Sequence, residues 1–446
     1  MKTQKIYTAK NVKPAKVHKT LSRHILADGY DLVLDLEKSQ GNYLYDSKSK
    51  RYLIDFFSFF ASGAIGMNHP AIKEKSFQKK LLRASLHKPT NSDIYTEELA
   101  TFVETFSKIV QPKYLPYSFF VEGGALAVEN ALKVAFDWKV QKNFKRGYKF
   151  EHGTQVIHFK EAFHGRSGYT MSLTNTDSKK IKYFPKFNWP RILNPKITFP
   201  LNDENLAKVI ALENEAIKQI KNAFQSQKDE IAAIIIEPVQ SEGGDNHFRK
   251  EFLQKLREFA DENEALLIFD EVQTGVGMSG KMWVHEYFVK PDIIAFGKKT
   301  HTCGISVGKR VDEIETNVMK IKSRLNSTFG GSLTDMVRFT KIMEVIKNEN
   351  LVENAKIHGK YLLTKIYQIQ NDFPNLFSNA RGLGLLCAVD LQNSDTRDKF
   401  VKSSFQKGVF LLGSGDKTVR FRPQLILDKK TIDEGFEILK KVAKTF

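Results

Sequence analysis

The stretch Leu266-Leu267-Ile268-Phe269-Asp270 decides the fold class. Four apolar residues in a row fit a strand that is buried on both faces of a parallel sheet, and an aspartate closes the run. A helix is predicted just before it, over residues 248–263, because Phe252, Leu256 and Phe259 recur at helical spacing. Together they form one unit of a parallel α/β sheet.

The same alternation continues on both sides of this unit. Short apolar or β-branched runs predict further strands at 118–121, 155–159, 231–236 and 292–296. The first of these runs is followed by Gly123-Gly124 and by a helix with one apolar face. We therefore expect a large α/β domain with a mainly parallel sheet over residues 86–340.

The two ends of the chain have a different pattern. Residues 341–446 mix helices with short strands, and the N-terminal segment 1–85 contains a hairpin-like stretch at 43–56. We expect these two segments to combine into one smaller α+β domain. The N-terminal segment then belongs to the small domain although the large domain separates it from the rest.

The last predicted helix has a specific start signal. Thr431 and Glu434 have the spacing of a capping box, which predicts Thr431 as the N-cap. Phe436, Leu439 and Val442 follow at helical spacing and form its apolar face.

The composition is that of a globular protein with a strong positive charge. Of 446 residues, 41% are hydrophobic and 27% charged, and 69 Lys and Arg against 51 Asp and Glu give +18. Such a charge raises the possibility of nucleic-acid binding. The charges are spread over stretches such as Lys2 to Lys19 and 179–186, so we expect a basic surface and no nucleic-acid partner.

Other compositional signals concern location. Apolar runs are far shorter than the ~20 residues of a membrane span, and residues 1–19 lack the apolar core of a secretory signal. Cys303 and Cys387 form no C-x-x-C motif, so neither a disulfide framework nor a thiolate metal site is predicted. These features favour a cytoplasmic protein with no membrane or metal partner.

Two predicted strand ends carry residues suited to hold an anion and a cation. Gly123-Gly124 opens a helix, where free backbone N–H groups can bind a phosphate, although a tight turn is the simpler explanation. Asp270 closes a buried strand, where its carboxylate needs a cation or donor such as a protonated pyridine nitrogen; an N-cap aspartate is the alternative. Ligands of parallel α/β sheets bind at such strand ends.

Two more strand ends supply a reactive amine and a recognition motif. Lys298-Lys299 follows the strand at 292–296, and a desolvated lysine can form a Schiff base. Because the chain has 69 Lys and Arg, an ordinary exposed lysine pair is the alternative interpretation of Lys298-Lys299. After the strand at 155–159, Phe163 can stack on a flat ring and Arg166 can bind a carboxylate.

These residues lie in longer stretches that resemble the class III (ornithine/GABA-type) aminotransferases, which belong to fold type I of the pyridoxal-phosphate enzymes. The likeness extends over nearly the whole chain. The matching stretches are 59–70, 120–130, 163–169, 237–238, 269–275, 296–300, 323–328 and 420–423.

The resemblance implies a cofactor site for pyridoxal 5'-phosphate. Lys299 is expected to bind the cofactor covalently, and Asp270 to pair with its protonated pyridine nitrogen, so that the ring accepts electrons. The other cofactor contacts that the family pattern assigns are Gly124, Ala125, Phe163, His164, Glu237, Gln273 and, from a neighbouring subunit, Thr328.

The resemblance also assigns the substrate residues. Arg420 is expected to bind the α-carboxylate of 2-oxoglutarate, and Glu242 to cover that arginine in the other half-reaction. Arg166, helped by Asn326, would hold the distal carboxylate of either substrate. A purely structural ion pair is the alternative for Glu242 and Arg420.

Two departures from the wider pattern, at 123–127 and 300–304, resemble the lysine branch of the family. The expected activity is transfer of the ε-amino group of L-lysine to 2-oxoglutarate, giving 2-aminoadipate 6-semialdehyde and glutamate. Another ω-aminotransferase, acting on ornithine, GABA or a diamine, is the alternative. The expected assembly is a homodimer with shared active sites.

Overall fold

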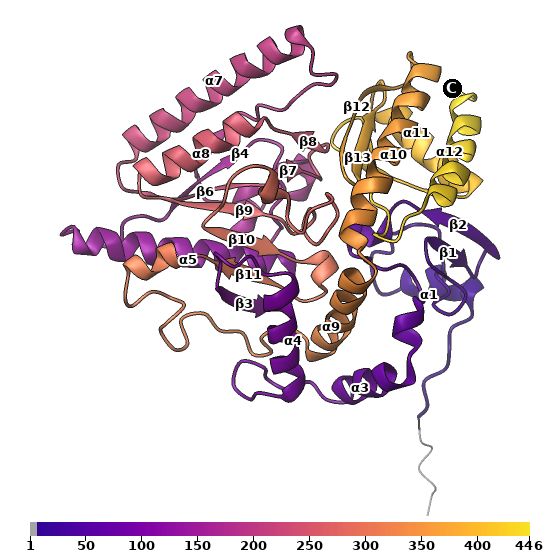
Figure 1. Cartoon of the computed structure of the whole chain (residues 1–446), viewed down its shortest axis with the longest axis horizontal. Helices are drawn as coiled ribbons and strands as arrows, with labels where there is room; N and C mark the ends of the chain where they lie inside the picture. Colours follow the sequence, from indigo (N-terminus) through magenta and orange to yellow (C-terminus); the bar gives the residue numbers. More distant parts are fainter. Residues whose placement is uncertain (1–6) are drawn as a thin grey trace, which may run out of the picture.

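The computed structural model describes residues 7–446. Residues 1–6, which belong to the predicted segment 1–85 and include the start of the basic stretch Lys2 to Lys19, lie outside the described residues. The strands of the chain (Figure 1) are β1 (Tyr43–Asp46), β2 (Arg51–Asp55), β3 (Tyr117–Val121), β4 (Gln155–Phe159), β5 (Arg191–Ile192), β6 (Ile231–Ile236), β7 (Val239–Gln240), β8 (Asn246–His247), β9 (Leu266–Asp270), β10 (Ile293–Phe296), β11 (Cys303–Val307), β12 (Ser378–Leu383), β13 (Leu386–Asp390), β14 (Val409–Phe410), β15 (Leu412–Ser414) and β16 (Thr418–Phe421). The helices are α1 (Val17–Leu21), α2 (Ser58–Ala61), α3 (Lys75–Ser85), α4 (Glu97–Ile109), α5 (Gly124–Lys145), α6 (Thr170–Leu173), α7 (Asp203–Ser226), α8 (Lys250–Glu262), α9 (Leu333–Asn348), α10 (Leu351–Asp372), α11 (Ser394–Lys407) and α12 (Lys429–Ala443).

The large sheet has seven strands in the order β3-β11-β10-β9-β6-β4-β5. All pairings from β10 to β5 are parallel, and β11 runs antiparallel to both of its neighbours. The prediction of an α/β fold with a mainly parallel sheet is therefore confirmed. The sequence did not predict β11, because Gly304 and Ser306 interrupt its apolar pattern.

Helices cover both faces of this sheet (Figure 1). Alternate residues of β9 enter different cores, as the period of two along a strand requires. Leu267 and Phe269 pack in the core that includes α7 and α8, whereas Leu266 and Ile268 pack in the core that includes α5. This burial on both faces explains the continuous apolar run that ends at Asp270.

The two ends of the chain meet in a second structural region. Strands β12, β13, β16 and β15 form one sheet, and β1, β2 and β14 form another. In the second sheet β14 lies parallel to β2, with Val409 opposite Ile54.

The predicted domain limits at residues 85 and 340 stay predictions. Residue 340 lies within the continuous helix α9, so no break in secondary structure marks that limit.

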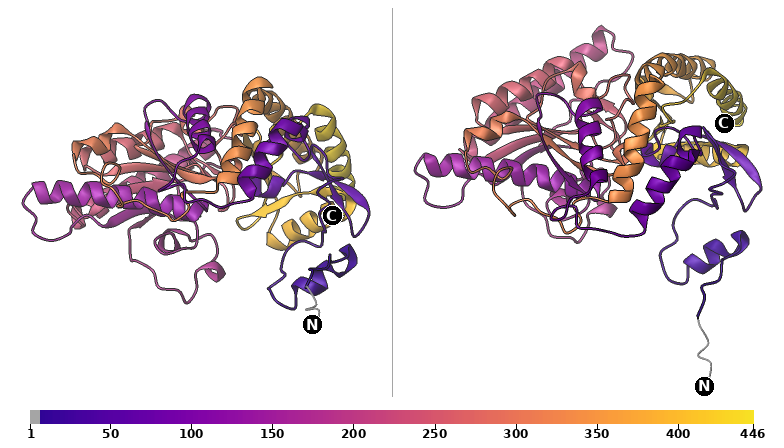
Figure 2. Two further views of the ribbon diagram at one scale, coloured as in Figure 1. Left: turned by 90° about the horizontal axis from the view of Figure 1, so that it is seen from below. Right: turned by 60° about the horizontal axis from the view of Figure 1, so that its bottom comes forward.

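The N-terminal part of the described chain extends from this region. Figure 2 shows the segment that carries α1 projecting away from the sheets.

Among the helices of residues 7–446, not one has the combination of length and apolar character that a membrane span requires.

The start of α12 differs from its prediction. The helix begins at Lys429, and the N-cap is Asp428, whose side chain accepts a hydrogen bond from Thr431 N at 2.7 Å. Glu434 instead accepts a hydrogen bond from the Tyr43 hydroxyl at 2.7 Å. The predicted capping box is wrong because an earlier aspartate, a strong N-cap residue, takes that position.

The segment α2 is a left-handed turn. Its four residues have φ values of +39° to +67°, which for residues other than glycine cost about 1–2 kcal/mol each. The buried Asp55 carboxylate holds the entry to the turn by accepting hydrogen bonds from Phe57 N at 2.9 Å and Ser58 N at 2.7 Å. This turn directs the carbonyl of Ala61 toward the lysine pair.

Candidate functional site

A cavity of about 670 Å³ lies where strands of the large sheet end. Asp270 reaches it from the end of β9, and the segment after β4 brings Phe163 and His164. The residues that line it are Ser62, Gly123, Gly124, Ala125, Phe163, His164, Gly165, Arg166, Glu237, Glu242, Asp270, Val272, Gln273, Lys298, His301, Cys303 and Asp335.

One end of the cavity is the N-terminus of α5. Gly123 is the N-cap with φ +99°, so no side chain caps the helix, and its first turn carries no acidic residue. A Cβ on Gly165 would come within 2.4 Å of Ala125 Cβ, so glycine permits the close packing of this loop on the helix. The free N–H groups of α5 and its dipole are suited to bind an anion.

Two buried carboxylates, Asp270 and Glu237, form part of the cavity lining. Asp270 is 5% exposed, and its Oδ2 lies 2.8 Å from His164 Nδ1. Glu237 accepts hydrogen bonds from Phe163 N at 2.9 Å and Ser241 N at 3.1 Å. Burial raises the pKa of Glu237 to about 7; the nearby His164 opposes this and the Asp270 charge adds to it. Within residues 7–446, the buried His164 Nε2 has no hydrogen-bond partner.

The two lysines have different surroundings. Lys299 is 1% exposed, and its Nζ donates to Ala61 O at 3.0 Å and Gln273 O at 3.1 Å. Burial, together with Lys298 and Arg422, holds the pKa of Lys299 well below its usual range. Lys298 lines the cavity, and burial with the charge of Arg420 lowers its pKa to about 8. The structure thus places Lys298 in the lining and the amine of Lys299 behind it.

An arginine pair closes the side near β16. Arg420 is 1% exposed and its Nη2 lies 2.7 Å from Glu242 Oε2. The Gln273 side-chain oxygen accepts hydrogen bonds from Arg420 Nη1 at 3.3 Å and from Arg422 Nε at 3.0 Å. Arg422 forms a buried ion pair with Asp245. Within the described chain the buried Arg420 Nε has no partner, so this guanidinium retains a free donor.

Most predicted site residues lie around this one cavity. The predicted residues in its lining are Gly124, Ala125, Phe163, His164, Arg166, Glu237, Glu242, Asp270 and Gln273. Lys299 and Arg420 adjoin the lining through their hydrogen bonds to Gln273 and Glu242. Thr328 and Asn326 are exposed on a separate loop and do not line the cavity.

Several residues of the cavity lining, and one residue that contacts the lining, were not predicted as site residues. His301 and Cys303 come two and four residues after Lys299, and this closeness in sequence could have identified them. Asp335 lies in the first turn of α9, after the N-cap Ser332. Lys180 carried no sequence signal, since it belongs to the stretch 179–186 that was interpreted as surface charge. The structure corrects that interpretation for Lys180, whose Nζ lies 2.8 Å from Glu242 Oε1.

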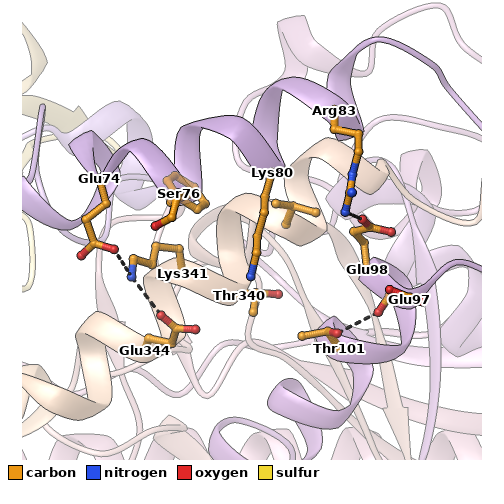
Figure 3. A pocket seen from close by; sticks show the side chains of 12 residues that line it. Glu74, Ser76, Lys80, Arg83, Glu97, Glu98, Thr101, Thr340, Lys341 and Glu344 are labelled. Carbon is orange, nitrogen blue, oxygen red and sulfur yellow. Dashed lines mark hydrogen bonds and ion pairs between the residues drawn. The ribbon is translucent and has the colours of Figure 1, made fainter.

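A second cavity, of about 300 Å³, lies between α3, α4 and α9 (Figure 3). Most of its charged side chains pair with one another. Lys341 Nζ lies 2.9 Å from Glu74 and 3.1 Å from Glu344, and Arg83 pairs with Glu98. None of the predicted site residues lines it.

The strand order and the grouping of lysine, carboxylate and helix N-terminus are those of a fold-type I transferase. Residues 25–443 match the family model of aminotransferase class III, and the chain belongs to this family. It is 50% identical to L-lysine-epsilon aminotransferase of Mycobacterium tuberculosis over 94% of this chain and 93% of that protein. It is 44% identical to L-lysine-epsilon aminotransferase of Amycolatopsis lactamdurans over 95% and 94% of the two chains.

A solved structure agrees with the sequence comparisons. The lysine aminotransferase from M. tuberculosis in the internal aldimine form superposes with a TM-score of 0.95 at 48% identity, over 97% of this chain and 100% of that one. Aminotransferases of class III use pyridoxal 5'-phosphate, which identifies the cofactor of this family member.

The cavity fits this cofactor by its own chemistry. The uncapped N-terminus of α5 suits the phosphate, and the buried carboxylate of Asp270 suits a protonated ring nitrogen. Phe163 and Val272 both line the cavity and offer apolar surface to a flat ring. The orphaned His164 Nε2 supplies a further polar group to a bound ligand.

Proposed function

We propose that this chain transfers the ε-amino group of L-lysine to 2-oxoglutarate, giving 2-aminoadipate 6-semialdehyde and glutamate. The observation that carries the proposal is the arrangement of Asp270, the lysine pair and the Glu242–Arg420 pair around one cavity. Relatives named L-lysine-epsilon aminotransferase at 44–50% identity support the choice of lysine over other ω-amines.

Residues of the chain hold the cofactor in this proposal. Gly124 and Ala125 at the start of α5 bind its phosphate, Phe163 packs on its ring, and Asp270 keeps its ring nitrogen protonated. His164 fixes the Asp270 carboxylate through the 2.8 Å contact, and Glu237 orients the backbone of Phe163. The bound cofactor supplies a protonated ring that accepts electrons from the reacting substrate carbon.

Lys299 is the proposed covalent and proton-transferring residue, as the second lysine of the family motif. Its lowered pKa leaves Nζ neutral often enough to act as a nucleophile and to carry a proton. The carbonyls of Ala61 and Gln273 hold Nζ at the edge of the cavity, and rotation of the side chain is needed to bring it in. Lys298, which already lines the cavity, is the competing candidate.

The substrate side uses two arginines in this proposal. Glu242 neutralises Arg420 while the uncharged end of lysine reacts, and it leaves Arg420 when the α-carboxylate of 2-oxoglutarate arrives. Arg166 is exposed at the rim and binds the distal carboxylate, with help from Asn326. One cavity can in this way accept an amine end and a carboxylate end in turn.

The proposed assembly is a homodimer in which Thr328 reaches the phosphate site of the neighbouring subunit. Its exposed position outside this chain's own cavity supports that arrangement. The loop is held to the segment 86–95 by a hydrogen bond from Ser92 Oγ to Ser327 O at 2.6 Å. In that segment Leu86, Ile94 and Tyr95 expose large apolar side chains, which a neighbouring subunit can cover.

The proposed location of the protein is the cytoplasm. Its two cysteines, Cys303 and Cys387, are buried and free, as is usual in a reducing compartment.

The decisive experiment is a half-reaction of the cofactor-loaded protein. L-lysine labelled with ¹⁵N at the ε position should bleach the cofactor absorbance, and the label should appear in glutamate after 2-oxoglutarate is added. Label retained in the keto product would contradict ε-transfer. Faster bleaching by ornithine or 4-aminobutyrate would favour the alternative ω-aminotransferase.

A further inference from the structure

Lys180 contacts the glutamate that covers Arg420. It ends a short 3₁₀ turn, Ser178–Lys180, and its Nζ lies 2.8 Å from Glu242 Oε1. The same ammonium lies 5.4 Å from the centre of the Phe163 ring, at the wall of the cavity. Both Lys180 and Glu242 are 27% exposed, so solvent screens their interaction only in part.

Glu242 therefore bridges two cations, one through each carboxylate oxygen. Oε2 meets the buried Arg420 and Oε1 meets the half-buried Lys180. Burial alone would raise the pKa of Glu242, but Arg420 and Lys180 outweigh it and lower the pKa to about 2. The carboxylate stays ionised throughout the working pH range.

The two cations differ in what else they can bind. Arg420 keeps a buried donor, Nε, without a partner in the described chain, so a second carboxylate has a place to bind. Besides the Phe163 ring, Lys180 has one further hydrogen-bond contact among the described residues, a weak one to Thr176 Oγ1 at 3.5 Å. When Arg420 takes a substrate carboxylate, Lys180 is the cation that remains beside Glu242.

We propose that Lys180 is a positioning residue that keeps Glu242 paired when this glutamate leaves Arg420, and so favours binding of the dicarboxylate substrate. The inference rests on the proposed function, because it assigns a residue to the exchange at Arg420. A partly buried carboxylate without a partner is costly, so loss of Lys180 makes departure from Arg420 less favourable. The lysine half-reaction, in which Glu242 stays on Arg420, depends on Lys180 far less.

The test compares Lys180→Met with Lys180→Arg and with Lys179→Met, since Lys179 is an exposed neighbour on the same turn. Lys180→Met should raise KM for 2-oxoglutarate about tenfold, as expected for loss of a half-buried ionic partner, with KM for L-lysine changed less than about twofold. Binding of glutarate, measured by calorimetry, should weaken by the same factor. Lys180→Arg should restore both values, and Lys179→Met should match the wild type.

A double variant separates positioning from direct substrate contact. In a Glu242→Gln background, Lys180→Met should have no further effect on glutarate binding, because no carboxylate remains to be held. An undiminished effect there would mean that Lys180 binds the substrate itself, and the proposal would be overturned. Equal values for Lys180→Met and Lys179→Met in the active enzyme would overturn it too. A wild type that reacts with neither substrate would instead refute the proposed function.

Discussion

Two cavities in the described part of the chain handle charge in opposite ways. In the cavity between α3, α4 and α9, Lys341 pairs with two half-exposed glutamates, Glu74 at 50% and Glu344 at 48%. Arg83, which pairs with Glu98 there, is itself 70% exposed. At the strand-end cavity, Asp270 and Lys299 are almost fully buried, and within residues 7–446 the buried His164 Nε2 and Arg420 Nε have no hydrogen-bond partner. The difference is the one between a solvated surface cleft and a site prepared for a charged ligand.

The largest loss of turnover is expected at the lysine pair. The difference between the two cavities depends most on the buried amine of Lys299. Lys299→Ala should lower kcat at least about a thousandfold, because the nucleophile and proton carrier are lost together. The visible absorbance of the covalently bound cofactor should disappear as well. Lys298→Ala, the matched control, should keep that absorbance; the reverse outcome would transfer the covalent role to Lys298.

A smaller but still large effect is expected at the buried carboxylate. Asp270→Asn should reduce kcat about a hundredfold or more, because the fixed charge that keeps the cofactor ring protonated is removed. Asp335→Asn changes another carboxylate in the lining of the same cavity and should stay within about threefold of the wild type. Equal losses in the two variants, measured by steady-state kinetics, would argue against a special role for Asp270.

The strand-end cavity should also make stability depend on pH. Burial and the nearby Arg338, opposed by Asp335, lower the pKa of His301 to about 4 from its ordinary 6.5. The unfolded chain therefore takes up a proton below pH 6.5 that the folded chain refuses until about pH 4. Stability falls as the pH drops through this window, by up to about 3 kcal/mol.

His301→Gln should remove this contribution, so that the variant loses less stability than the wild type between pH 7 and pH 5. Denaturant unfolding at both pH values measures the difference. Other buried histidines are common to both proteins and cancel in the comparison. An identical pH response of the two proteins would show that folding does not lower the pKa of His301.

The smallest effect is expected in the cavity of Figure 3. Lys341→Met removes the cation shared by Glu74 and Glu344, and the free energy of unfolding should change by no more than about 1 kcal/mol, as for other exposed ion pairs. Turnover should be unchanged. If Lys341→Met lowered kcat as much as Asp270→Asn, the cavity between α3, α4 and α9 would also contribute to catalysis, contrary to this prediction.

The parts of the fold that could be predicted from sequence are those with strong local patterns. The run at 266–270 is apolar because the sheet is covered on both faces, so its strand and its closing aspartate were evident. Strand β11 was missed because its place depends on pairing with β3 and β10, which lie far away in sequence or across a turn. The start of α12 was predicted wrongly because both Asp428 and Thr431 are suited to the N-cap, and Asp428 takes that position.

The candidate site shows the same limit. Asp270 and Gly124 mark strand and helix ends, where position alone indicates a role. Lys180 is indistinguishable in sequence from Lys179, and only the path of the loop turns one toward Glu242 and leaves the other exposed. For the same reason, sequence could not determine which of the two adjacent lysines faces the cavity.

The pairing of β14 with β2 has a consequence for how the chain folds during synthesis. The strands of the large sheet all leave the ribosome before residue 308, so that sheet can be completed while translation continues. Strand β2 is made early, yet Val409 and Phe410, its parallel neighbours, are made only after all strands of the large sheet. The N-terminal hairpin must therefore wait with an unpaired edge, the stage at which a nascent chain is most open to chaperones and to aggregation.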